Sequence, residues 1–311
     1  MHLPKYNKIV LAGGSGYLGT VLARHFRHLA DKVIILSRTV KPADGNVQTI
    51  SWDGQQEGDW VRQLESADLL VNLCGKNVNC RYTEKNKEEI LLSRTTPTLL
   101  LGNTIQQLQH PPALWINVTS ATIYRHAEDR AQDEDTGETG YGFSIDICRQ
   151  WEEIFFQTPA PCTRKIALRM GIVLGQRDGV FPRLLNLVKW GLGGRQGDGA
   201  QYISWIHEQD AARCIEWLTD QTGQSGIINC TAPEAIRNRD FMAIIRQAYG
   251  TPIGLPAPTW LLEIGAAFIG TETELILKSR WVSPKRLLDA GFSFHYPAAS
   301  NAVHDLLSIR G

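Results

Sequence analysis

The 311-residue chain has no excess of either charge, because 32 lysines and arginines balance 32 aspartates and glutamates. Without a basic excess or a polybasic block, we expect it to bind neither nucleic acid nor an anionic membrane surface. No run of 18 apolar residues is present, and the N-terminal segment Met1-His2-Leu3-Pro4-Lys5 lacks the apolar core of a signal peptide. These absences predict a soluble, cytoplasmic protein whose partner is a small molecule.

The six cysteines are scattered and form no C-x-x-C pair, so reduced core cysteines are expected. The sequence also lacks the residue spacing typical of a metal site. His25 and His28 lie three residues apart on one predicted helix, but no third ligand accompanies them. We therefore predict no metal site.

The strongest motif lies at residues 9–19, where an apolar strand pattern leads into glycines at positions 13, 16 and 19 and then into a helical segment. A turn of this kind lets backbone amides approach a pyrophosphate, and the helix N-terminus favours its negative charge. In this context the pattern predicts a dinucleotide site rather than a plain structural turn. The residues predicted to contact the cofactor here are Gly13, Ser15, Gly16, Tyr17, Leu18 and Gly19.

The end of the next predicted strand, Lys32–Ser37, favours one cofactor over the other. NAD sites usually carry Asp or Glu there to accept from the ribose hydroxyls, whereas this chain has Arg38. A guanidinium binds a 2′-phosphate in bidentate fashion, and Ser37 adds a hydroxyl. No carboxylate lies between Lys32 and Lys41. The sequence thus predicts NADP in preference to NAD.

Strand-like and helical runs alternate through the first half, which predicts an α/β fold with a doubly wound parallel sheet. We predict a Rossmann-type domain over 1–231, with substrate-loop insertions at about 179–206, and a mostly helical C-terminal lobe over 232–311. The lobe is expected to form one wall of the substrate cleft. The glycine-rich loop Gly191–Gly199 is read either as a lid or as a plain surface turn. Expected strands are Lys32–Ser37, Val47–Trp52, Asp68–Cys74, Ala113–Thr119, Lys165–Leu174, Tyr202–Ile206 and Gly226–Thr231, and expected helices are Thr20–Ala30, Thr83–Gln109, Ser144–Gln157 and Glu208–Thr219.

Several motifs resemble the extended, epimerase-like branch of the short-chain dehydrogenase/reductase superfamily. The spacing G-x-x-G-x-x-G fits that branch, and Asn72-Leu73-Cys74-Gly75 is similar to the Asn-x-Ala-Gly turn that lies over its cofactor. From residue 8 to about residue 297 the chain resembles an atypical, nucleoside-diphosphate-sugar epimerase-like subfamily of NAD(P)-dependent epimerase/dehydratase proteins with a C-terminal helical segment. The resemblance implies the fold, the cofactor, and contacts from Leu73, Cys74, Gly75 and Thr119. The matching motifs are Arg81-Tyr82-Thr83-Glu84, Ser93-Arg94, Thr119-Ser120-Ala121, Trp151-Glu152, Leu168–Gly175, Ser204-Trp205-Ile206-His207, Ser283–Leu287 and Ala290-Gly291-Phe292.

The catalytic Tyr-x-x-x-Lys pair of that superfamily is absent. In active members the lysine holds the nicotinamide ribose and lowers the pKa of a tyrosine one helical turn away. None of the eight tyrosines is followed four residues later by lysine, and no lysine occurs between Lys87 and Lys165. The resemblance places Phe143 and Ile147 at the two positions, with Tyr141 nearby. Neither side chain can do the work of the pair, so the usual ketone–alcohol mechanism fails here.

Two residues are candidates to handle a substrate oxygen. Ser120 follows a predicted strand and matches the family's catalytic serine, although a serine at a strand end also bonds to the backbone. Tyr124 lies four residues on, and without a cationic neighbour beside its phenol we expect its pKa to stay near about 10. It is predicted to act as an acid or, alternatively, to be an aromatic residue of the core or the pocket wall.

The predicted substrate contacts are Arg81, Arg94 and His207. Arg81 and Lys85 have i,i+4 spacing and are read either as an anion site or as an exposed helix face. Arg94 lies among leucines, which predicts a partly buried arginine whose fixed partner is a ligand or a carboxylate. His207 stands between a strand and a helix, as an acid/base or as a structural residue.

Two functions are consistent with these features. The first is an NADP-dependent oxidoreductase or isomerase of a small, sugar-like or carbonyl substrate. The alternative is a catalytically inactive NADP(H)-binding sensor or scaffold, which the missing Tyr/Lys pair favours. Either a monomer or a homodimer is expected.

Overall fold

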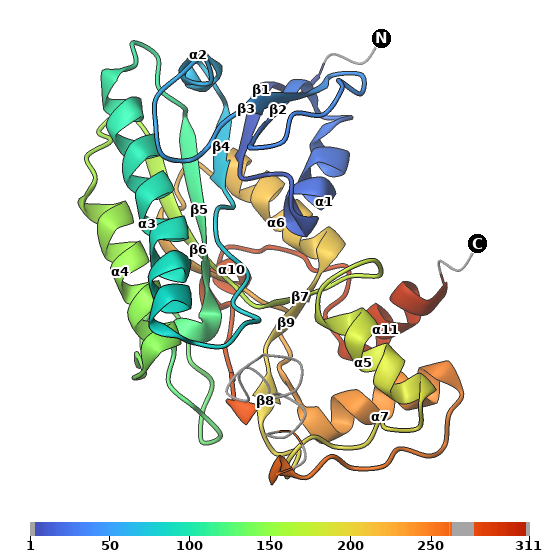
Figure 1. Ribbon diagram of the computed structural model, residues 1–311. Helices are drawn as coiled ribbons and strands as arrows, with labels where there is room; N and C mark the ends of the chain where they lie inside the picture. Colours follow the sequence, from blue (N-terminus) through green and yellow to red (C-terminus); the bar gives the residue numbers. More distant parts are fainter. Residues whose placement is uncertain (1–3, 261, 263–276, 309–311) are drawn as a thin grey trace.

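The centre of the molecule is a seven-stranded sheet in which every neighbouring pair of strands is parallel (Figure 1). The computed structural model describes residues 4–260, 262 and 277–308. The strand order is β10-β6-β5-β4-β1-β2-β3, and the direction of winding reverses between β1 and β4. At such a reversal a doubly wound sheet opens a crevice for ligands. The strands are β1 (Tyr6–Ala12), β2 (Ala30–Ser37), β3 (Val47–Ser51), β4 (Leu69–Asn72), β5 (Leu114–Ser120), β6 (Arg164–Met170) and β10 (Gly226–Cys230).

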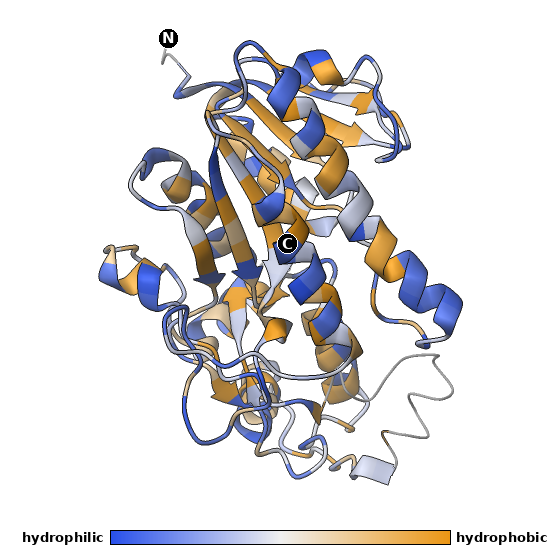
Figure 2. Ribbon diagram, turned by 90° about the vertical axis from the view of Figure 1, so that its left-hand side faces the viewer, coloured by the Kyte–Doolittle hydropathy of each residue, from blue (hydrophilic) through white to orange (hydrophobic). Residues whose placement is uncertain are grey.

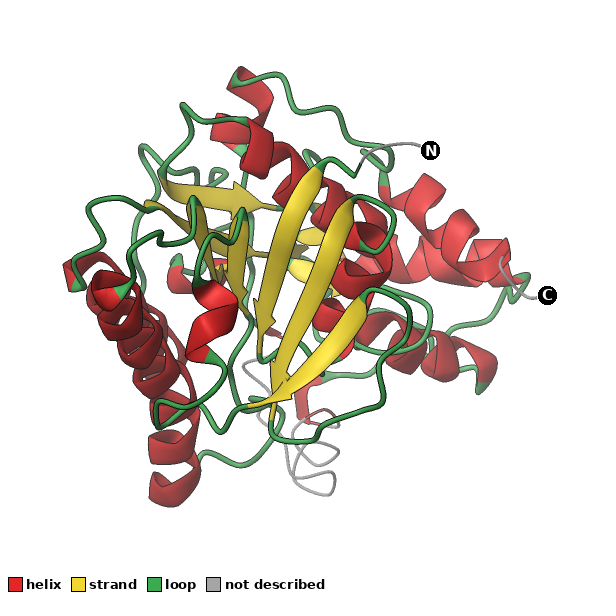
Figure 3. Cartoon of the chain, turned by 90° about the horizontal axis from the view of Figure 1, so that it is seen from above, coloured by secondary structure: helices red, strands yellow, loops and turns green. Residues whose placement is uncertain are grey.

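Helices cover both faces of this sheet (Figure 3), so the predicted doubly wound fold is confirmed. α1 (Tyr17–Phe26) and α6 (Glu208–Asp220) pack on one face, and α3 (Glu84–Gln107) and α4 (Phe143–Gln157) on the other, with the short α2 (Val61–Leu64) beside them. Side chains of β1 alternate between the two cores: Ile9 and Leu11 join the α1–α6 side, and Val10 and Ala12 the α3–α4 side. The strands are accordingly apolar along most of their length (Figure 2).

A second apolar core lies beyond the carboxyl ends of the strands. It is built from Phe181 and Leu184, from Phe241 and Ile245, and from Val303, which belong to three helices. These are α5 (Val180–Lys189), α7 (Asn238–Tyr249) and α11 (Ala299–Ser308). Two small sheets border it: β7 (Ile172–Leu174) pairs with β9 (Trp205–His207), and β8 (Tyr202–Ile203) with β11 (Ile236–Arg237); η1 (Ala121–Ile123) follows β5, and α10 (Lys285–Asp289) packs near β10.

The structure divides two of the expected strands. The chain leaves the main sheet at Gly171, where a Cβ would lie 2.9 Å from the carbonyl oxygen of Ser204, so 165–174 becomes β6 and β7. The stretch 202–206 likewise divides between β8 and β9, which pair with different strands.

The helices differ less from expectation. α1 ends at Phe26, because Ala30, its expected end, pairs with Tyr6 as the first residue of β2. α5 was not predicted. Part of the predicted C-terminal lobe, 263–276, lies outside the described residues. Within the described ranges, no helix combines the length and apolar character needed to cross a membrane.

Candidate functional site

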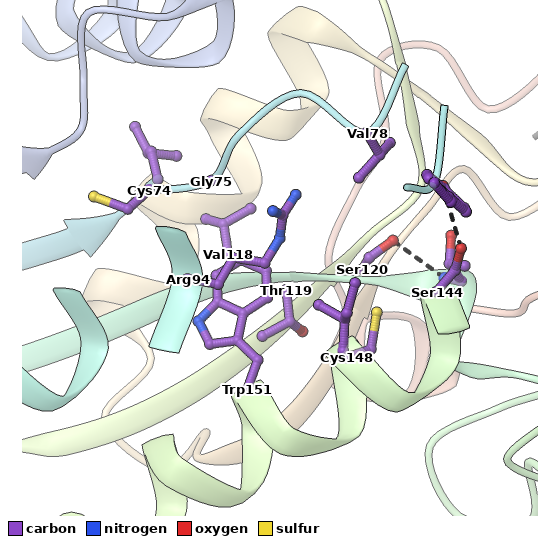
Figure 4. Close-up of a pocket in the computed structure, with 14 residues that line it drawn as sticks. Cys74, Gly75, Val78, Arg94, Val118, Thr119, Ser120, Ser144, Cys148 and Trp151 are labelled. Carbon is purple, nitrogen blue, oxygen red and sulfur yellow. Dashed lines mark hydrogen bonds between the residues drawn. The ribbon is translucent and has the colours of Figure 1, made fainter. Parts of the chain in front are cut away.

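A cavity of about 240 Å³ lies where β4 and β5 end (Figure 4). Its walls come from the turn after β4, from the end of β5, and from one face of α4. The α4 residues in the wall are Ser144, Ile147, Cys148 and Trp151, whose spacing puts them on a single helical face. The cavity thus adjoins the crevice that the strand order predicts between β1 and β4.

The glycine turn beside this cavity exposes backbone rather than side chains. Gly13 has φ +71°, and a Cβ there would lie 2.8 Å from Sγ of Cys74, so only glycine suits this position. Gly16 precedes α1 without a side-chain capping bond, and no atom lies within 4 Å of a Cβ placed on it. The first amides of α1 therefore face open space, which is the arrangement that binds a pyrophosphate. A Cβ on Gly19 would overlap the carbonyl of Gly14, so helix and turn pack closely.

Two other residues of the turn are partly engaged in packing. The Tyr17 hydroxyl is buried and has no hydrogen-bond partner among the described residues, and a Cβ placed on Gly175 would overlap it and the Glu208 carboxylate. Leu18 packs against the core on the α1–α6 side. Tyr17 and Leu18 can therefore offer a cofactor their backbone amides. Ser15, by contrast, is exposed.

Arg38 directly follows β2 and is exposed, with no hydrogen bond or ion pair to any residue within the described ranges. Ser37 is buried and its Oγ accepts from the backbone N–H of Thr39 at 3.3 Å. Burial raises the pKa of the Cys74 thiol to about 12, while the guanidinium groups of Arg38 and Arg94 act against that shift. Both arginines therefore lie near the turn after β4.

That turn is fixed by a buried amide network. Oδ1 of Asn72 accepts from the backbone N–H of Cys74 at 3.1 Å. Its Nδ2 donates to Oδ1 of Asn117 at 2.6 Å and to Oγ1 of Thr98 at 3.0 Å. The network ties β4 to β5 and α3. It thereby places Leu73, Cys74 and Gly75 along one wall of the cavity.

Ser120 and Thr119 end β5 with their side chains at the cavity. Oγ of Ser120 accepts from the backbone N–H of Thr122 at 3.2 Å, so the hydroxyl caps η1 and also faces the cavity. Its own hydrogen stays available to an oxygen in the cavity. The Thr119 hydroxyl donates to Glu152 at 2.9 Å, and Glu152 is paired with Arg169 at 2.7 Å.

Tyr124, predicted as an acid or as a core or pocket-wall aromatic residue, is not among the residues that line the cavity. The side chain is only 2% exposed, and its hydroxyl donates to Oδ1 of Asn229 at 3.0 Å. The expectation that it lacks a cationic neighbour is wrong, because the Arg169 guanidinium lies 4.9 Å from the ring centre. Burial raises the pKa of Tyr124, with Arg169 opposing the shift. Tyr124 is thus the core aromatic of the alternative reading.

Phe143, which the resemblance places at the tyrosine position, is the first residue of α4, and Ile147 lines the cavity one turn on. The Phe143 ring meets the ring of Tyr82 edge-on, with 4.8 Å between centroids. Tyr82 lines the cavity from the segment after β4, and its hydroxyl lies 3.4 Å from Oγ of Ser144. Tyr141, by contrast, is 92% exposed.

Sequence reasoning did not assign Tyr82 or the α4 wall to the site. The signal for the wall was the spacing 144, 147, 148 and 151 on one predicted helix. No local signal marks Tyr82, because only the fold brings it against Phe143.

The structure separates the three predicted substrate residues. Arg81 precedes α3, which begins at Glu84, so its i,i+4 relation to Lys85 does not place both on one helix face. Arg81 is exposed and outside the cavity lining. Lys85 is exposed, and its Nζ lies 4.0 Å from Oε1 of Glu89. This arrangement agrees with the alternative of an exposed helix face. Arg94 does line the cavity, and its Nη1 and Nη2 donate to carbonyl oxygens rather than to a carboxylate.

His207, predicted as an acid/base or as a structural residue, is not among the residues that line the cavity. It is 1% exposed and stacks on Tyr296 with 3.8 Å between ring centroids. Its Nδ1 accepts from the backbone N–H of Gln209 at 3.2 Å, capping α6, and its Nε2 lies 3.2 Å from Oδ2 of Asp305. Burial lowers the pKa of His207, with Asp305 opposing. The position is inaccessible to a ligand because the packed histidine joins α6 to α11.

The loop Gly191–Gly199 does not line the cavity. It is hydrogen-bonded along its length to the segment after α7: Leu255 donates to Gly191 at 2.8 Å, Gly194 to Leu255 at 3.1 Å, and Gly197 to Ala257 at 2.9 Å. From the predicted C-terminal lobe, Lys278 reaches the rim, where its Nζ donates to the carbonyl of Thr122 at 3.1 Å. No cluster of three His, Cys, Asp or Glu side chains suited to a metal is present among the described residues.

Two family models match the sequence. The "NAD dependent epimerase/dehydratase family" covers residues 9–231, and a "Domain of unknown function (DUF1731)" covers residues 257–306. The chain is 29% identical over 305 residues to "Epimerase family protein SDR39U1" of Mus musculus, covering 97% of this chain and 100% of that protein. It is 30% identical over 303 residues to "Epimerase family protein YfhF" of Bacillus subtilis, covering 97% and 98%.

Solved structures of epimerase-like proteins are also similar to this chain. The crystal structure of human epimerase family protein SDR39U1 (isoform 2) with NADPH superposes with a TM-score of 0.86 and 28% identity, over 97% of this chain and 99% of that one. A UDP-N-acetylglucosamine 4-epimerase from Bacillus cereus superposes with a TM-score of 0.76 at 17% identity, over 98% of this chain and 97% of that one, a likeness of fold alone.

Proposed function

The chain belongs to the NAD dependent epimerase/dehydratase family, and from this premise we propose that it is an NADP(H)-dependent oxidoreductase or isomerase of a small carbonyl or sugar-like substrate. Two observations carry the cofactor: Arg38 is exposed at the end of β2 and has no partner among the described residues, and the N-terminus of α1 is open. The presence of NADPH in the structure of the human relative supports the same cofactor.

The residues of this chain fit the proposed cofactor in separate regions. The amides at the start of α1 suit the pyrophosphate, and the Arg38 guanidinium with the Ser37 segment suits the 2′-phosphate. Leu73, Cys74 and Gly75 border the cavity into which the reactive end would extend. When bound, NADP(H) donates or accepts a hydride. All other chemistry has to come from the side chains around the cavity.

In the proposed reaction Ser120 positions the substrate oxygen. Its hydroxyl caps η1 through a lone pair, so its hydrogen is free to donate to an oxygen in the cavity. The α4 wall excludes water through the apolar side chain of Ile147 and the indole of Trp151. Phe143 and Ile147 have no proton to exchange, so proton transfer has to run through a hydroxyl of the cavity or through a water molecule held by one.

The missing Tyr-x-x-x-Lys pair supports a second candidate function, a catalytically inactive NADP(H)-binding sensor or scaffold. The two functions share the cofactor and differ in turnover. Substrate turnover on any carbonyl compound would exclude the sensor. NADPH binding with no hydride exchange across a broad panel of aldehydes, ketones and sugar nucleotides would favour it.

The experiment that tests the cofactor is a calorimetric titration with NADPH and with NADH. We expect the wild type to prefer NADPH, and Arg38→Asp to weaken NADPH binding about 10- to 100-fold, as loss of charge-assisted hydrogen bonds predicts. NADH binding should change by no more than about threefold, since it carries no 2′-phosphate. Arg62→Asp is the matched control, because Arg62 is exposed on α2 and pairs only with Asp59. Equal affinity of wild type and Arg38→Asp for NADPH would refute the assignment.

A further inference from the structure

Of the described residues that line the cavity, Arg94 alone carries a charged side chain. Nη1 donates to the carbonyl of Ile90 at 2.9 Å, and Nη2 donates to the carbonyl of Lys76 at 3.1 Å. The guanidinium lies 5.4 Å from the centre of the Trp151 ring. A Cβ on Gly75 would lie 3.0 Å from Cζ of Arg94, so the glycine leaves the space that the guanidinium fills (Figure 4).

Among the residues that the structure describes, this guanidinium has no anionic partner. One further bond, a long one of 3.4 Å, joins Nη1 to Oγ of Ser93, so each described acceptor is a neutral oxygen. No aspartate or glutamate of the described ranges lines the cavity. Burial lowers the pKa of Arg94, because a cation is poorly solvated there. An anion beside the guanidinium would offset that cost.

Other partly buried arginines of the described chain are satisfied differently. Arg169 is paired with Glu152 at 2.7 Å, and Arg213 with Asp210 at 2.8 Å. Arg164 donates to three backbone carbonyls, two in the last turn of α6 and one beyond its end. It is not among the residues that line the cavity. Arg94 combines neutral partners with a position in the wall of this cavity, at the ends of β4 and β5. Its Nε–H and one Nη2 hydrogen have no acceptor among the residues that the structure describes.

The rest of the cavity suits a small oxyanion. Lys278 brings a second cation to the rim through its bond to the carbonyl of Thr122. Hydroxyls of Ser120, Ser144 and Tyr82 supply hydrogen-bond donors within the lining. The volume of about 240 Å³ is below the ~300–1,000 Å³ of pockets that bury drug-sized ligands, so the occupant has few atoms.

We propose that Arg94 binds an oxyanion of the substrate, a carboxylate or a phosphate, while Ser120 faces its carbonyl oxygen. The planar fork of a guanidinium matches either oxyanion through two parallel hydrogen bonds. This assignment rests on the proposed function and narrows its substrate to a small, anionic carbonyl compound. A neutral sugar or an uncharged ketone would leave the cation of the cavity unmatched.

The test is a calorimetric and thermal-melting titration with acetate, malonate and inorganic phosphate at constant ionic strength, with and without saturating NADPH. The variants are Arg94→Gln and Arg94→Lys, and Arg81→Gln is the matched control, since Arg81 is an exposed arginine outside the lining. We expect at least one oxyanion to bind the wild type with NADPH present. Its affinity should fall at least tenfold in Arg94→Gln, fall less in Arg94→Lys, and stay unchanged in Arg81→Gln. Preference for carboxylates or for phosphate identifies the substrate group.

The other outcomes separate failure of this inference from failure of the proposed function. Equal binding by the wild type and Arg94→Gln, or no binding of any oxyanion, would exclude an anion site at Arg94 while NADPH binding left the proposed function standing. Loss of oxyanion binding as NADPH saturates would mean that Arg94 serves a phosphate of the cofactor instead of the substrate. Failure of the wild type to bind NADPH would refute the proposed function. Oxyanion binding to the cofactor-free protein, compared with Arg94→Gln, would then decide the role of Arg94 separately.

Discussion

The carboxylate of Glu152 and the guanidinium of Arg169 form a buried ion pair at the back of the cavity, with 2.7 Å between Oε2 and Nη2 and less than a tenth of either side chain exposed. A second bond joins Oε1 to Nε at 2.9 Å, and Oε1 also accepts from the Thr119 hydroxyl. The pair thus ties α4 to β5 and β6, the elements that carry the Ser120 end and the α4 wall.

Removing the charge of Glu152 should therefore destabilise the fold. We expect Glu152→Gln to lower the free energy of unfolding by about 3 kcal/mol, because it leaves a buried guanidinium uncompensated. Glu153→Gln is the matched control, since Glu153 is exposed on the same helix, and it should cost no more than about 0.5 kcal/mol. Urea denaturation of both variants measures the difference. Equal midpoints would show that the pair contributes nothing to stability.

Ser120 should matter for turnover and not for cofactor affinity. Ser120→Ala removes the hydroxyl that faces the cavity, while no predicted cofactor contact uses that oxygen. We expect the NADPH dissociation constant to stay within about twofold, and turnover of any substrate accepted by the wild type to fall about 100-fold or more. Loss of the η1 cap should cost about 1 kcal/mol of stability, so rates are compared well below the melting temperature. A normal rate in Ser120→Ala would remove the serine from the mechanism.

Much of this architecture is encoded locally, and for that reason the sequence predicts it. The glycine turn and Arg38 directly follow single strands, so their positions depend only on neighbouring residues. Tyr124 differs, because its burial depends on a bond to Asn229, 105 residues away. His207 likewise depends on α11, which supplies Asp305. Contacts of such long sequence separation leave no periodic signal, so the sequence left a reactive and a structural interpretation open for both residues.

The buried His207 should make stability depend on pH. Nδ1 accepts from Gln209, so protonating it would break the α6 cap, and burial already lowers the pKa of the ring. In the unfolded chain the pKa is about 6.5. The unfolded state therefore takes up the proton first as pH falls. The stabilisation is fully present above about pH 6.5 and is lost below it, by at most about 1.4 kcal/mol per pH unit.

Replacing this histidine tests the sign of that effect. His207→Asn keeps a capping acceptor but has no titrating group, so its unfolding free energy should fall less between pH 7 and pH 5 (about two units) than that of the wild type. His28→Asn, at an exposed position of the chain, should leave the wild-type slope unchanged. Urea denaturation at a series of pH values provides the measurement. A slope in His207→Asn as steep as in the wild type would mean that other groups carry the acid sensitivity.

Two glycines of the turn should respond in opposite ways to the same added methyl group. At Gly16 the backbone has φ −77°, and no atom lies within 4 Å of a Cβ, so Gly16→Ala should keep the stability of the wild type within about 0.5 kcal/mol. The methyl group would nevertheless occupy the space where a pyrophosphate meets the amides of α1. We expect NADPH to bind at least tenfold more weakly, measured by calorimetric titration alongside thermal melting.

At Gly19 a Cβ would overlap the carbonyl of Gly14. Gly19→Ala should therefore push α1 away from the turn and lower the melting temperature sharply, since backbone cannot yield as a flexible side chain does. The contrast separates the two roles of the glycines, open approach at Gly16 and close packing at Gly19. If Gly16→Ala melted like the wild type and also bound NADPH as tightly, the pyrophosphate would have to lie elsewhere, and the N-terminus of α1 would lose its place in the cofactor site.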